Sequence, residues 1–288
     1  DLGLVDGIGT EDEILGKIRE LVTYLPSNCE DTDSYMECTD DLNRVCEDIE
    51  NCTGDTAIAL SRIADNGQFF EVKADYGKSV AVGFIRLNGA TVGAVANRSE
   101  CYDAEGKKVW ESDGTLSARG ARKAAEFVKF CDAFEIPVLT LTNVNGFKAT
   151  VCGEKMMAKS VGALVHAFAD ATVPKVNVVI GKAFGTAYTA MNSKAIGADM
   201  VYAWENAEIG MMDADLAAKI MYAGDDAAAL TEKAAEYREL QNSVSSAAAR
   251  GYVDTIISPA DTRKYVIGAF EMLFTKREER PSKKHGTV

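Results

Sequence analysis

The segment VNVVIGKAFGTAYTA, residues 176–190, decides the fold prediction for this chain. Its β-branched first part is typical of a buried strand. We expect this strand to break at Gly181 and a helix to follow over residues 189–196. The turn between them, residues 182–187, can point backbone N–H groups outward at the start of a helix, which suits an oxygen that gains negative charge. An ordinary strand–helix turn is the alternative interpretation.

The composition sets broad limits on fold and function. The chain has 288 residues, 47% of them hydrophobic, which allows one large domain or two small ones with real cores. Its formal charge of −13 argues against a nucleic-acid partner, because neutralising phosphates requires clustered Lys and Arg. We see no signal peptide and no apolar run near the roughly 20 residues that a membrane helix needs.

Seven cysteines and two histidines restrict the metal chemistry. Four of the cysteines lie between Cys29 and Cys52, but their spacings match no usual zinc pattern, so free thiols are favoured. His166 lies on an apolar helix stripe and His285 in a basic tail, which leaves neither a histidine-rich metal site nor a Ser-His-Asp triad. We expect a cytoplasmic protein with no bound metal.

Apolar periodicity predicts strands and helices along most of the chain. We expect two parts: residues 1–55, with an N-terminal helix and an acidic irregular segment, and a main domain over residues 56–288. Asn88-Gly89 is a strong hairpin signal, whereas residues 101–113 are expected to form a polar loop with a turn at Glu105-Gly106. Helices are expected over residues 11–24, 56–64, 117–134, 154–169, 189–196, 214–222, 226–241, 246–250 and 259–276. Strands are expected over residues 69–72, 79–87, 91–96, 137–144, 175–180, 200–203 and 256–258, with a short extended piece at Ile209.

Strands and helices alternate regularly from Ser117 onward, which predicts α/β layering with right-handed crossovers. Three successive strands end in turns at residues 145–147, 185–187 and 206–208. Ligand sites in such sheets gather where the carboxyl ends of strands converge. This convergence favours the functional interpretation of the turn at Gly185.

Longer segments, taken together, are similar to one enzyme family. In order along the chain they resemble the C-terminal half of the carboxyltransferase of biotin-dependent acyl-CoA carboxylases. That family includes propionyl-CoA carboxylase β subunits, methylmalonyl-CoA carboxyltransferases and acyl-CoA decarboxylase α subunits. The matching segments are YLPSN (24–28), VGFIRLNGATVGAVAN (82–97), KAAEFVKFCDAFEIPVLTL (123–141), NGF (145–147), ATVPK (171–175), KAFGTAYTAMNSKAIGAD (182–199), AWENAEIGMM (203–212), AAARGYVDTII (247–257) and KREERPSKKHG (276–286).

The resemblance implies a crotonase-like (ClpP/crotonase) fold, a superhelix of ββα units, with this chain as a single carboxyltransferase C-terminal domain. A family chain is about twice this size and has two related halves. The N-terminal half binds the acyl-CoA, and the C-terminal half supplies the biotin side of a site across a dimer interface. The implied partners are an N-terminal-half chain or domain, a biotin carrier protein, biotin carboxylase or membrane decarboxylase subunits, and further copies in a homo- or hetero-oligomer.

Gly185 matches the first glycine of the family's AYGGAY turn, and Thr186 stands where the family has a second glycine. Glycine is favoured where the backbone approaches a ligand or takes a positive φ. Either the turn needs no positive φ at Thr186 or the oxyanion site is altered. The flanking residues Phe184 and Ala187 are expected to help bind biotin. Tyr188 is expected to pack in the core rather than to act as an acid.

The second matching loop begins at Gly146 and Phe147, which correspond to the start of the family's PGF loop. The Pro-Gly that follows in the family is replaced by residues 149–150, with Lys148 before it, which puts the substrate range and the activity in question. Lys148, Ala149 and Glu154 are counted as biotin-binding. A carboxylate favoured by the helix dipole is the alternative interpretation of Glu154.

The implied reaction moves a carboxyl group between N1-carboxybiotin, held on a separate carrier, and the α-carbon of a short acyl-CoA. Backbone amides suit the two negative charges that develop, and no side-chain base is required if biotin takes the α-proton. The predicted catalytic groups are Gly185, Thr186, Gly146 and Phe147. Lys175 and Lys182 could meet CoA phosphates from a partner, with solvated or helix-paired side chains as the alternative, which is favoured for Lys175.

Two other functions compete with this one. The first is a non-catalytic crotonase-fold assembly subunit of such a complex, whose loop at residues 148–152 and Thr186 have drifted. The second is a stand-alone crotonase-type hydratase or isomerase, which ranks last because no acidic pair accompanies the oxyanion glycine.

Overall fold

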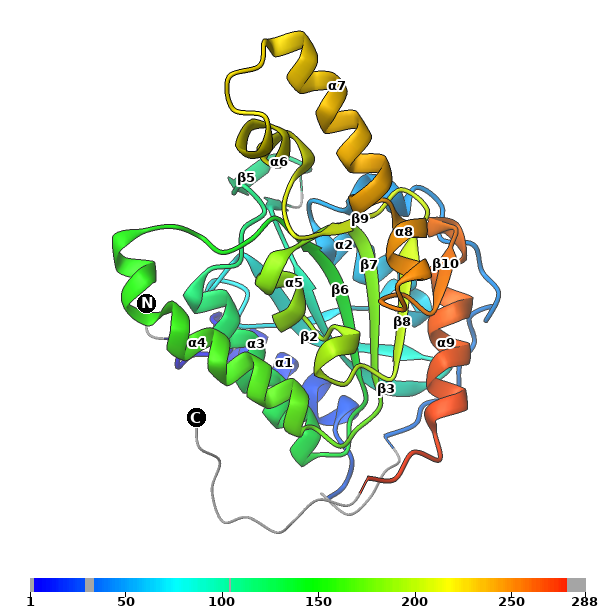
Figure 1. Cartoon of the computed structure of the whole chain (residues 1–288). Helices are drawn as coiled ribbons and strands as arrows, with labels where there is room; N and C mark the ends of the chain where they lie inside the picture. The colour runs from blue at the N-terminus through cyan, green and yellow to red at the C-terminus, as the bar shows by residue number, and fades with distance from the viewer. Residues whose placement is uncertain (1–2, 29–33, 104, 279–288) are drawn as a thin grey trace.

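The computed structural model describes residues 3–28, 34–103 and 105–278, and its centre is a mixed β-sheet (Figure 1). Within these residues eight strands pair in the order β1-β2-β3-β6-β7-β8-β10, and β9 pairs with β7. The strands β1, β2 and β3 are antiparallel, whereas the pairs from β3 to β10 are parallel. Their bounds are β1 Phe70–Val72, β2 Val80–Leu87, β3 Ala90–Asn97, β6 Val138–Val144, β7 Lys175–Phe184, β8 Met200–Trp204, β9 Glu208–Gly210 and β10 Thr255–Ile257.

Helices cover both faces of the sheet, because successive side chains of a strand point to opposite faces. On one face, α3 (Ala118–Ala133) and α4 (Val151–Asp170) pack side by side over a core that includes Val179 of β7. On the other face, α2 (Thr56–Ile63) and α9 (Thr262–Leu273) pack over Val176 and Val178 of the same strand. The layering predicted from the alternation of strands and helices is therefore confirmed.

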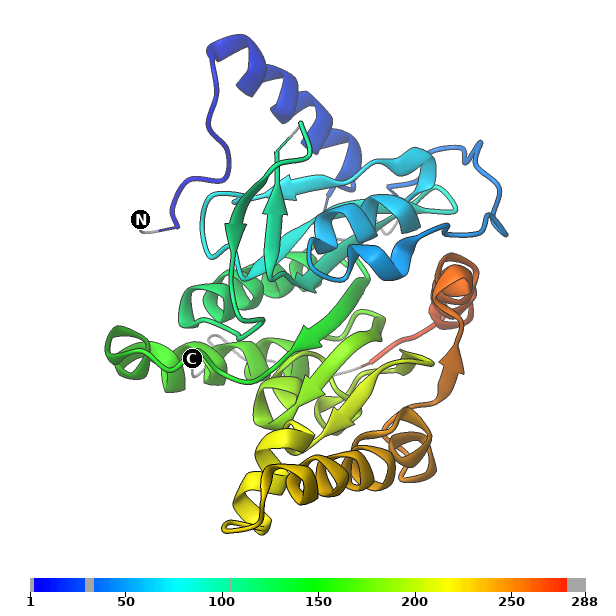
Figure 2. The ribbon, with the colours of Figure 1, turned by 90° about the horizontal axis from the view of Figure 1, so that it is seen from above.

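The remaining helices lie at the ends and rim of the sheet. They are α1 (Glu11–Tyr24), α5 (Gly185–Ala190), α6 (Ala214–Met221), α7 (Ala227–Tyr237) and α8 (Val244–Ala249), with short 3-10 turns at Ile49–Cys52, Asp65–Gly67, Lys194–Ile196 and Pro259–Asp261 and a π turn at Arg238–Asn242. Helices α6 and α7 form a hairpin that projects beyond the sheet in Figure 1, and α1 stands out from the body in Figure 2. None of the helices in the described residues combines the length and the apolar character needed to cross a bilayer.

Two hairpins connect or flank the strands. The predicted turn at Asn88-Gly89 is confirmed, since both residues have positive φ (51° and 79°), as a type I′ turn requires. The prediction of an irregular loop over residues 101–113 is wrong, because β4 (Glu100–Tyr102) and β5 (Lys108–Glu111) pair as antiparallel strands. Both strands are short and only partly buried, which weakens the strand pattern, although the turn at Gly106 (φ 77°) is where it was predicted.

Two helices begin earlier than predicted. Strand β7 does not end at Gly181 but continues to Phe184, and α5 spans Gly185–Ala190 instead of the predicted 189–196, where only Lys194–Ile196 forms a further 3-10 turn. Helix α4 starts at Val151 instead of residue 154, because the hydroxyl of Thr150 accepts a hydrogen bond from the Gly153 amide (3.0 Å) and caps the helix. In both cases residues predicted as loop form the first helical turn.

The N-terminal segment is attached to the main sheet by specific contacts. The Tyr24 ring is buried in the core beside Phe84 (centroids 6.0 Å apart), and Tyr35 forms a bridge with Ala90 at the start of β3. The boundary at residues 55/56 stays a prediction. Cys29 and the basic tail around His285 lie outside the described residues.

Candidate functional site

Three parallel strands end together at one edge of the sheet. Val144 of β6 pairs with Ala183 of β7, and Phe184 of β7 pairs with Gly210 of β9. The segments that follow these strands therefore leave the sheet beside one another. We call this edge the carboxyl end of the sheet. It brings together the predicted turns after β6 and β7, whereas the third predicted turn, residues 206–208, leads from β8 into β9.

Gly185 begins the segment after β7 and occupies a backbone conformation that requires glycine. Its φ is 63°, and an added Cβ would lie 3.2 Å from the carbonyl oxygen of Met211. Thr186 lies inside α5 with an exposed side chain and no positive φ. The replacement of a second glycine by threonine is therefore compatible with this turn.

Helix α5 differs from most other helices of the protein at its first turn. The first amides of a helix have no acceptor within that helix, and a side chain of the N-cap residue usually accepts one of their hydrogen bonds. In the described residues Ser, Thr or Asp side chains cap α1, α2, α3, α4, α6, α7 and α8 in this way. The N-cap of α5 is Phe184, which makes no side-chain cap hydrogen bond. Its side chain and that of Ala187 are buried, so only their main chain can face a ligand.

The segment after β6 is held by main-chain pairing with residues 114–116. The Leu116 amide donates to the Gly146 carbonyl (2.8 Å), and the Lys148 amide donates to the Leu116 carbonyl (3.0 Å). Gly146 has φ 134°, and no atom lies within 4 Å of the position its Cβ would take. Phe147 packs against the core with a partly buried ring, whereas Lys148 and Ala149 are exposed. The loop is therefore fixed along one side and open at Gly146.

The side chains around this edge offer no obvious acid–base group. Burial raises the pKa of Tyr188 to about 12, and its hydroxyl has no hydrogen-bond partner among the described residues, as expected for a packing role. Lys182 lies 3.5 Å from Asp213 in a half-exposed ion pair. Glu154 is exposed in the first turn of α4, where the helix dipole favours a carboxylate. Its predicted binding role stays a prediction.

Lys175 has a structural position rather than a binding one. Its side chain is buried, and Nζ donates to the carbonyls of Phe168 (2.7 Å) and Ala171 (2.9 Å) at the end of α4. The suggested contact of Lys175 with CoA phosphates is therefore wrong, because the ammonium group is not accessible and satisfies helix carbonyls instead.

Sequence reasoning missed Asn143, which lies on β6 beside this edge. Its side chain accepts a hydrogen bond from the Lys182 amide (3.0 Å). The sequence did hold a signal for this residue: Asn143 is polar and stands near the end of an apolar strand, and the next strand contains Gly181.

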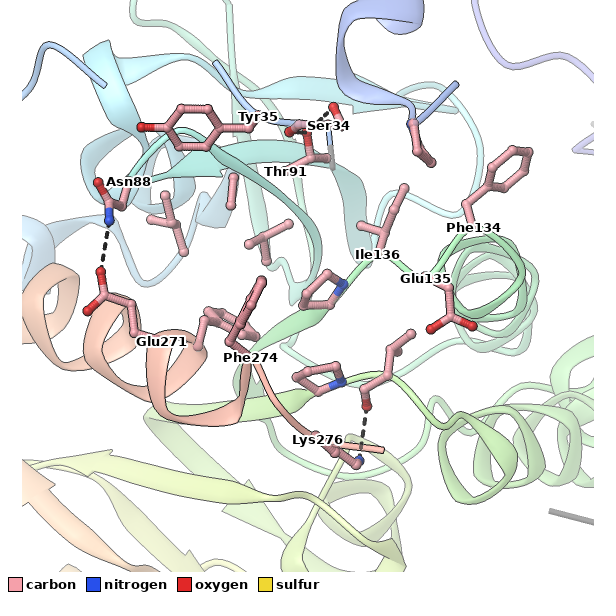
Figure 3. Close-up of a pocket in the computed structure, with 18 of the residues that line it drawn as sticks. Ser34, Tyr35, Asn88, Thr91, Phe134, Glu135, Ile136, Glu271, Phe274 and Lys276 are labelled. Carbon is pink, nitrogen blue, oxygen red and sulfur yellow. Dashed lines mark hydrogen bonds between the residues drawn. The ribbon is translucent and has the colours of Figure 1, made fainter. Parts of the chain in front are cut away.

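A cavity of about 490 Å³ lies at the opposite edge, where β6 and β7 begin (Figure 3). Apolar side chains such as Ile136 and Phe274 form much of its wall, and Asn88 Nδ2 donates to Glu271 at its rim (2.8 Å). None of the sequence-predicted site residues lines it.

Comparison with known proteins gives concordant results. The sequence pattern of the carboxyl transferase domain family matches residues 3–288. The chain is 38% identical over 293 residues to the carboxyltransferase subunit of propionyl-CoA carboxylase from Haloferax mediterranei, covering 97% of this chain and 55% of that one. It is 40% identical over 281 residues to the methylmalonyl-CoA carboxyltransferase 12S subunit of Propionibacterium freudenreichii, covering 93% and 52%. The chain thus spans about half the length of these relatives.

A solved structure supports the fold assignment. The transcarboxylase 12S structure with hydrolysed methylmalonyl-coenzyme A bound, described as a hexamer assembly and a multienzyme core, has a TM-score of 0.84 to this chain. The identity is 39%, and the match covers 94% of this chain and 53% of that one. The crotonase-like α/β fold expected from the sequence is confirmed by this likeness.

Proposed function

The chain belongs to the carboxyl transferase domain family, and from that premise we propose that it is the biotin-side half of an acyl-CoA carboxyltransferase. It moves a carboxyl group between N1-carboxybiotin and the α-carbon of a short acyl-CoA of the propionyl or acetyl type. The observation that carries this proposal is the uncapped first turn of α5 at the carboxyl end of the sheet.

The residues at this edge fit the ureido group of biotin. Gly146 leaves open space where any other residue would place a side chain, and the first amides of α5 have neither an acceptor within the helix nor a side-chain cap. When bound, carboxybiotin would supply the carboxyl group, and the ureido group left behind would carry negative charge on its oxygen until it took up the α-proton that the acyl-CoA loses.

The amides of Gly185 and Thr186 hold this oxygen by hydrogen bonds, and the segment at Gly146 and Phe147 forms the facing wall. Such preorganised donors act without reorganising during the reaction, and losing one typically costs about 10²–10³ in kcat. Lys148, Ala149 and Glu154 border the site from the start of α4, and Phe184 and Ala187 contribute main chain only. No ionisable side chain of this chain is needed to hold the charge.

The acyl-CoA side of the site belongs to a partner. The relatives are about twice as long as this chain, so an N-terminal-half chain or domain completes the enzyme. Apolar side chains on and before α6 are exposed, including Met211 (75% exposed) and Ile220 (61% exposed), which suits an assembled oligomer, and the carbonyl of Met211 lies beside Gly185. A biotin carrier delivers the cofactor, and biotin carboxylase or membrane decarboxylase subunits complete the complex. A cytoplasmic location stays a prediction.

The test is a reconstitution. This chain is co-purified with the N-terminal half of the Propionibacterium freudenreichii 12S subunit, and assembly is verified by size-exclusion chromatography. Decarboxylation of methylmalonyl-CoA and malonyl-CoA is then measured with biotin methyl ester as the acceptor. We expect turnover that depends on both the biotin ester and this chain.

A non-catalytic assembly subunit is the alternative, and one observation favours it. Residues 149–150 replace the family's Pro-Gly, and Thr150 instead serves as the N-cap of α4. An assembled complex that shows no biotin-dependent turnover would support this alternative and contradict the proposed enzyme.

A further inference from the structure

Strand β7 carries a bulge just before the candidate site. Thr142 of β6 pairs with Val179 and Val144 pairs with Ala183, so the single residue Asn143 lies opposite residues 180–182 of β7. Within this stretch β7 also leaves one neighbouring strand for another. Its last pair with β8 is at Val179, and its first pair with β9 is at Lys182.

The side chain of Asn143 replaces the ladder contacts that the bulge removes. Its Oδ1 accepts a hydrogen bond from the Lys182 amide (3.0 Å), and its Nδ2 donates to the Thr53 carbonyl (3.1 Å). The Asn143 amide donates to Oδ1 of Asn97 at the end of β3 (3.2 Å). A Cβ on Gly181 would lie 2.6 Å from Oδ1 of Asn143, so this arrangement also excludes a side chain at position 181.

Asn143 is placed between the two glycines of the candidate site. Along its own strand it lies three residues before Gly146, and through the hydrogen bond to Lys182 it lies three residues before Gly185. Both glycines have positive φ (134° and 63°), so the chain turns directly after the part that Asn143 holds. The Asn143 side chain therefore links the two segments at the bulge, one residue before the strands pair again at Val144 and Ala183.

We propose that Asn143 is the positioning residue that sets the Gly185 amide against the Gly146 segment. The catalytic effect of this role rests on the proposed function, whereas the contacts of Asn143 that support it do not depend on that function. The required chemistry is an acceptor for the Lys182 amide. Aspartate at position 143 keeps that acceptor but loses the Nδ2 donor to the Thr53 carbonyl, whereas alanine removes both groups.

The first test measures the structure without using activity. Amide hydrogen exchange is followed in the intact chain and in N143A, with Thr140→Ala as the matched control. Thr140 is buried on the same strand and accepts a hydrogen bond from Asn192 (3.2 Å). We expect exchange at the Lys182 amide to become at least about tenfold faster in N143A and to stay unchanged in T140A. Equal protection in N143A and the native chain would overturn the proposal.

The second test uses the reconstituted complex. A displacement of about 1 Å in catalytic groups typically costs about 10²-fold, so we expect kcat to fall 10- to 100-fold in N143A while KM for the acyl-CoA stays unchanged. Asn143→Asp keeps the acceptor for the Lys182 amide and should lose less kcat than N143A, and T140A should be unaffected. An unchanged kcat in N143A, or an equal loss in N143D, would overturn the positioning role. If the native complex is inactive but the exchange difference is present, the proposed function fails and the structural role of Asn143 stands.

Discussion

The two ends of the sheet differ in whether side chains form hydrogen bonds with nearby main-chain amides. Where β6 and β7 begin, side chains form hydrogen bonds with main-chain amides. Asp65 accepts hydrogen bonds from the amides of Asn88 (3.2 Å) and Gly89 (2.8 Å), and the buried Arg263 forms an ion pair with Asp65 (2.6 Å). Where the strands end, α5 starts at Gly185, and its N-cap residue Phe184 provides no side-chain cap. At the first end polar side chains hold the backbone of the fold, whereas at the second no side chain caps the helix that follows the strand.

The difference shows why the cavity and the candidate site lie at opposite ends. The cavity in Figure 3 lies between α9 and the turn of the β2–β3 hairpin, where nearby main-chain groups already have partners within the protein. A site that stabilises negative charge needs donors that are fixed in place and not yet bonded. The lack of a side-chain cap on α5 is the feature at the carboxyl end of the sheet on which the proposed site rests.

The largest expected effect is on stability, at the end where side chains hold the backbone. Arg263→Leu leaves Asp65 buried without its cation, which we expect to lower the free energy of unfolding by about 3–5 kcal/mol. Arg122→Leu is the matched control, since it removes an exposed ion pair with Glu126 (2.9 Å) and should cost about 0.5 kcal/mol or less. Urea unfolding measures both. Similar losses of unfolding free energy in the two variants would show that the buried Arg263–Asp65 pair does not hold this end of the sheet.

The next effect is on activity, at the opposite end. Gly185→Val should lower kcat of the reconstituted complex by about 10²–10³-fold, because a valine cannot hold φ 63° beside the Met211 carbonyl without moving the amide. Gly106→Val is the control: it has a similar φ of 77° with open space around it, in the β4–β5 hairpin. Complex assembly should survive in both. Full activity in the Gly185 variant would show that the site is elsewhere.

A third effect concerns how the stability of the fold depends on pH through the buried Lys123. Burial lowers the pKa of Lys123 to about 8, while the unfolded chain keeps a value near 10.4. Between these values the unfolded state binds more protons, so stability should rise with pH. Relative to Lys123→Met, the native chain should gain on the order of 3 kcal/mol between about pH 7.5 and pH 10.5. Unfolding curves at both pH values test this, and a pH-independent difference would count against it.

The smallest effect concerns the capped helix that borders the site. Thr150→Ala removes the hydroxyl that accepts from the Gly153 amide, which should cost about 1 kcal/mol of stability. Because Thr150 caps α4 and does not hold the α5 amides, kcat per folded complex should stay within about twofold. A thermal unfolding series with activity measured on the same samples checks both values. A large loss of kcat would place Thr150 in the site itself.

Much of the fold could be predicted because it follows apolar periodicity. Strands such as β2 and β6 are buried along their length, and the Asn88-Gly89 turn needs two positive φ values that few residue pairs accept. The hairpin of β4 and β5 escaped prediction because its strands are short and exposed. Its order comes from cross-strand contacts such as Lys108 with Glu100 (2.7 Å), which no local pattern encodes.

The candidate site was predictable in outline and not in detail. The resemblance located Gly146 and Gly185, and the strand register places them at one edge. The bulge opposite Asn143 could not be read from β7 alone, because it depends on a hydrogen bond from a neighbouring strand. The early start of α5 was hidden for a related reason. Gly185 and Thr186 are typical of loops, and here the helix starts directly after the last residue of β7 that pairs with β9, with Gly185 at φ 63°.

The most direct test observes the amides themselves. The chain, labelled with ¹⁵N and assembled with its N-terminal-half partner, is titrated with biotin methyl ester while the amide resonances of Gly185 and Thr186 are followed. We expect both amide protons to shift downfield in a saturable way, because they gain a hydrogen bond to the ureido oxygen. The amide resonance of Gly106 should stay unchanged. Saturable shifts confined to other residues, with Gly185 and Thr186 unaffected, would contradict it.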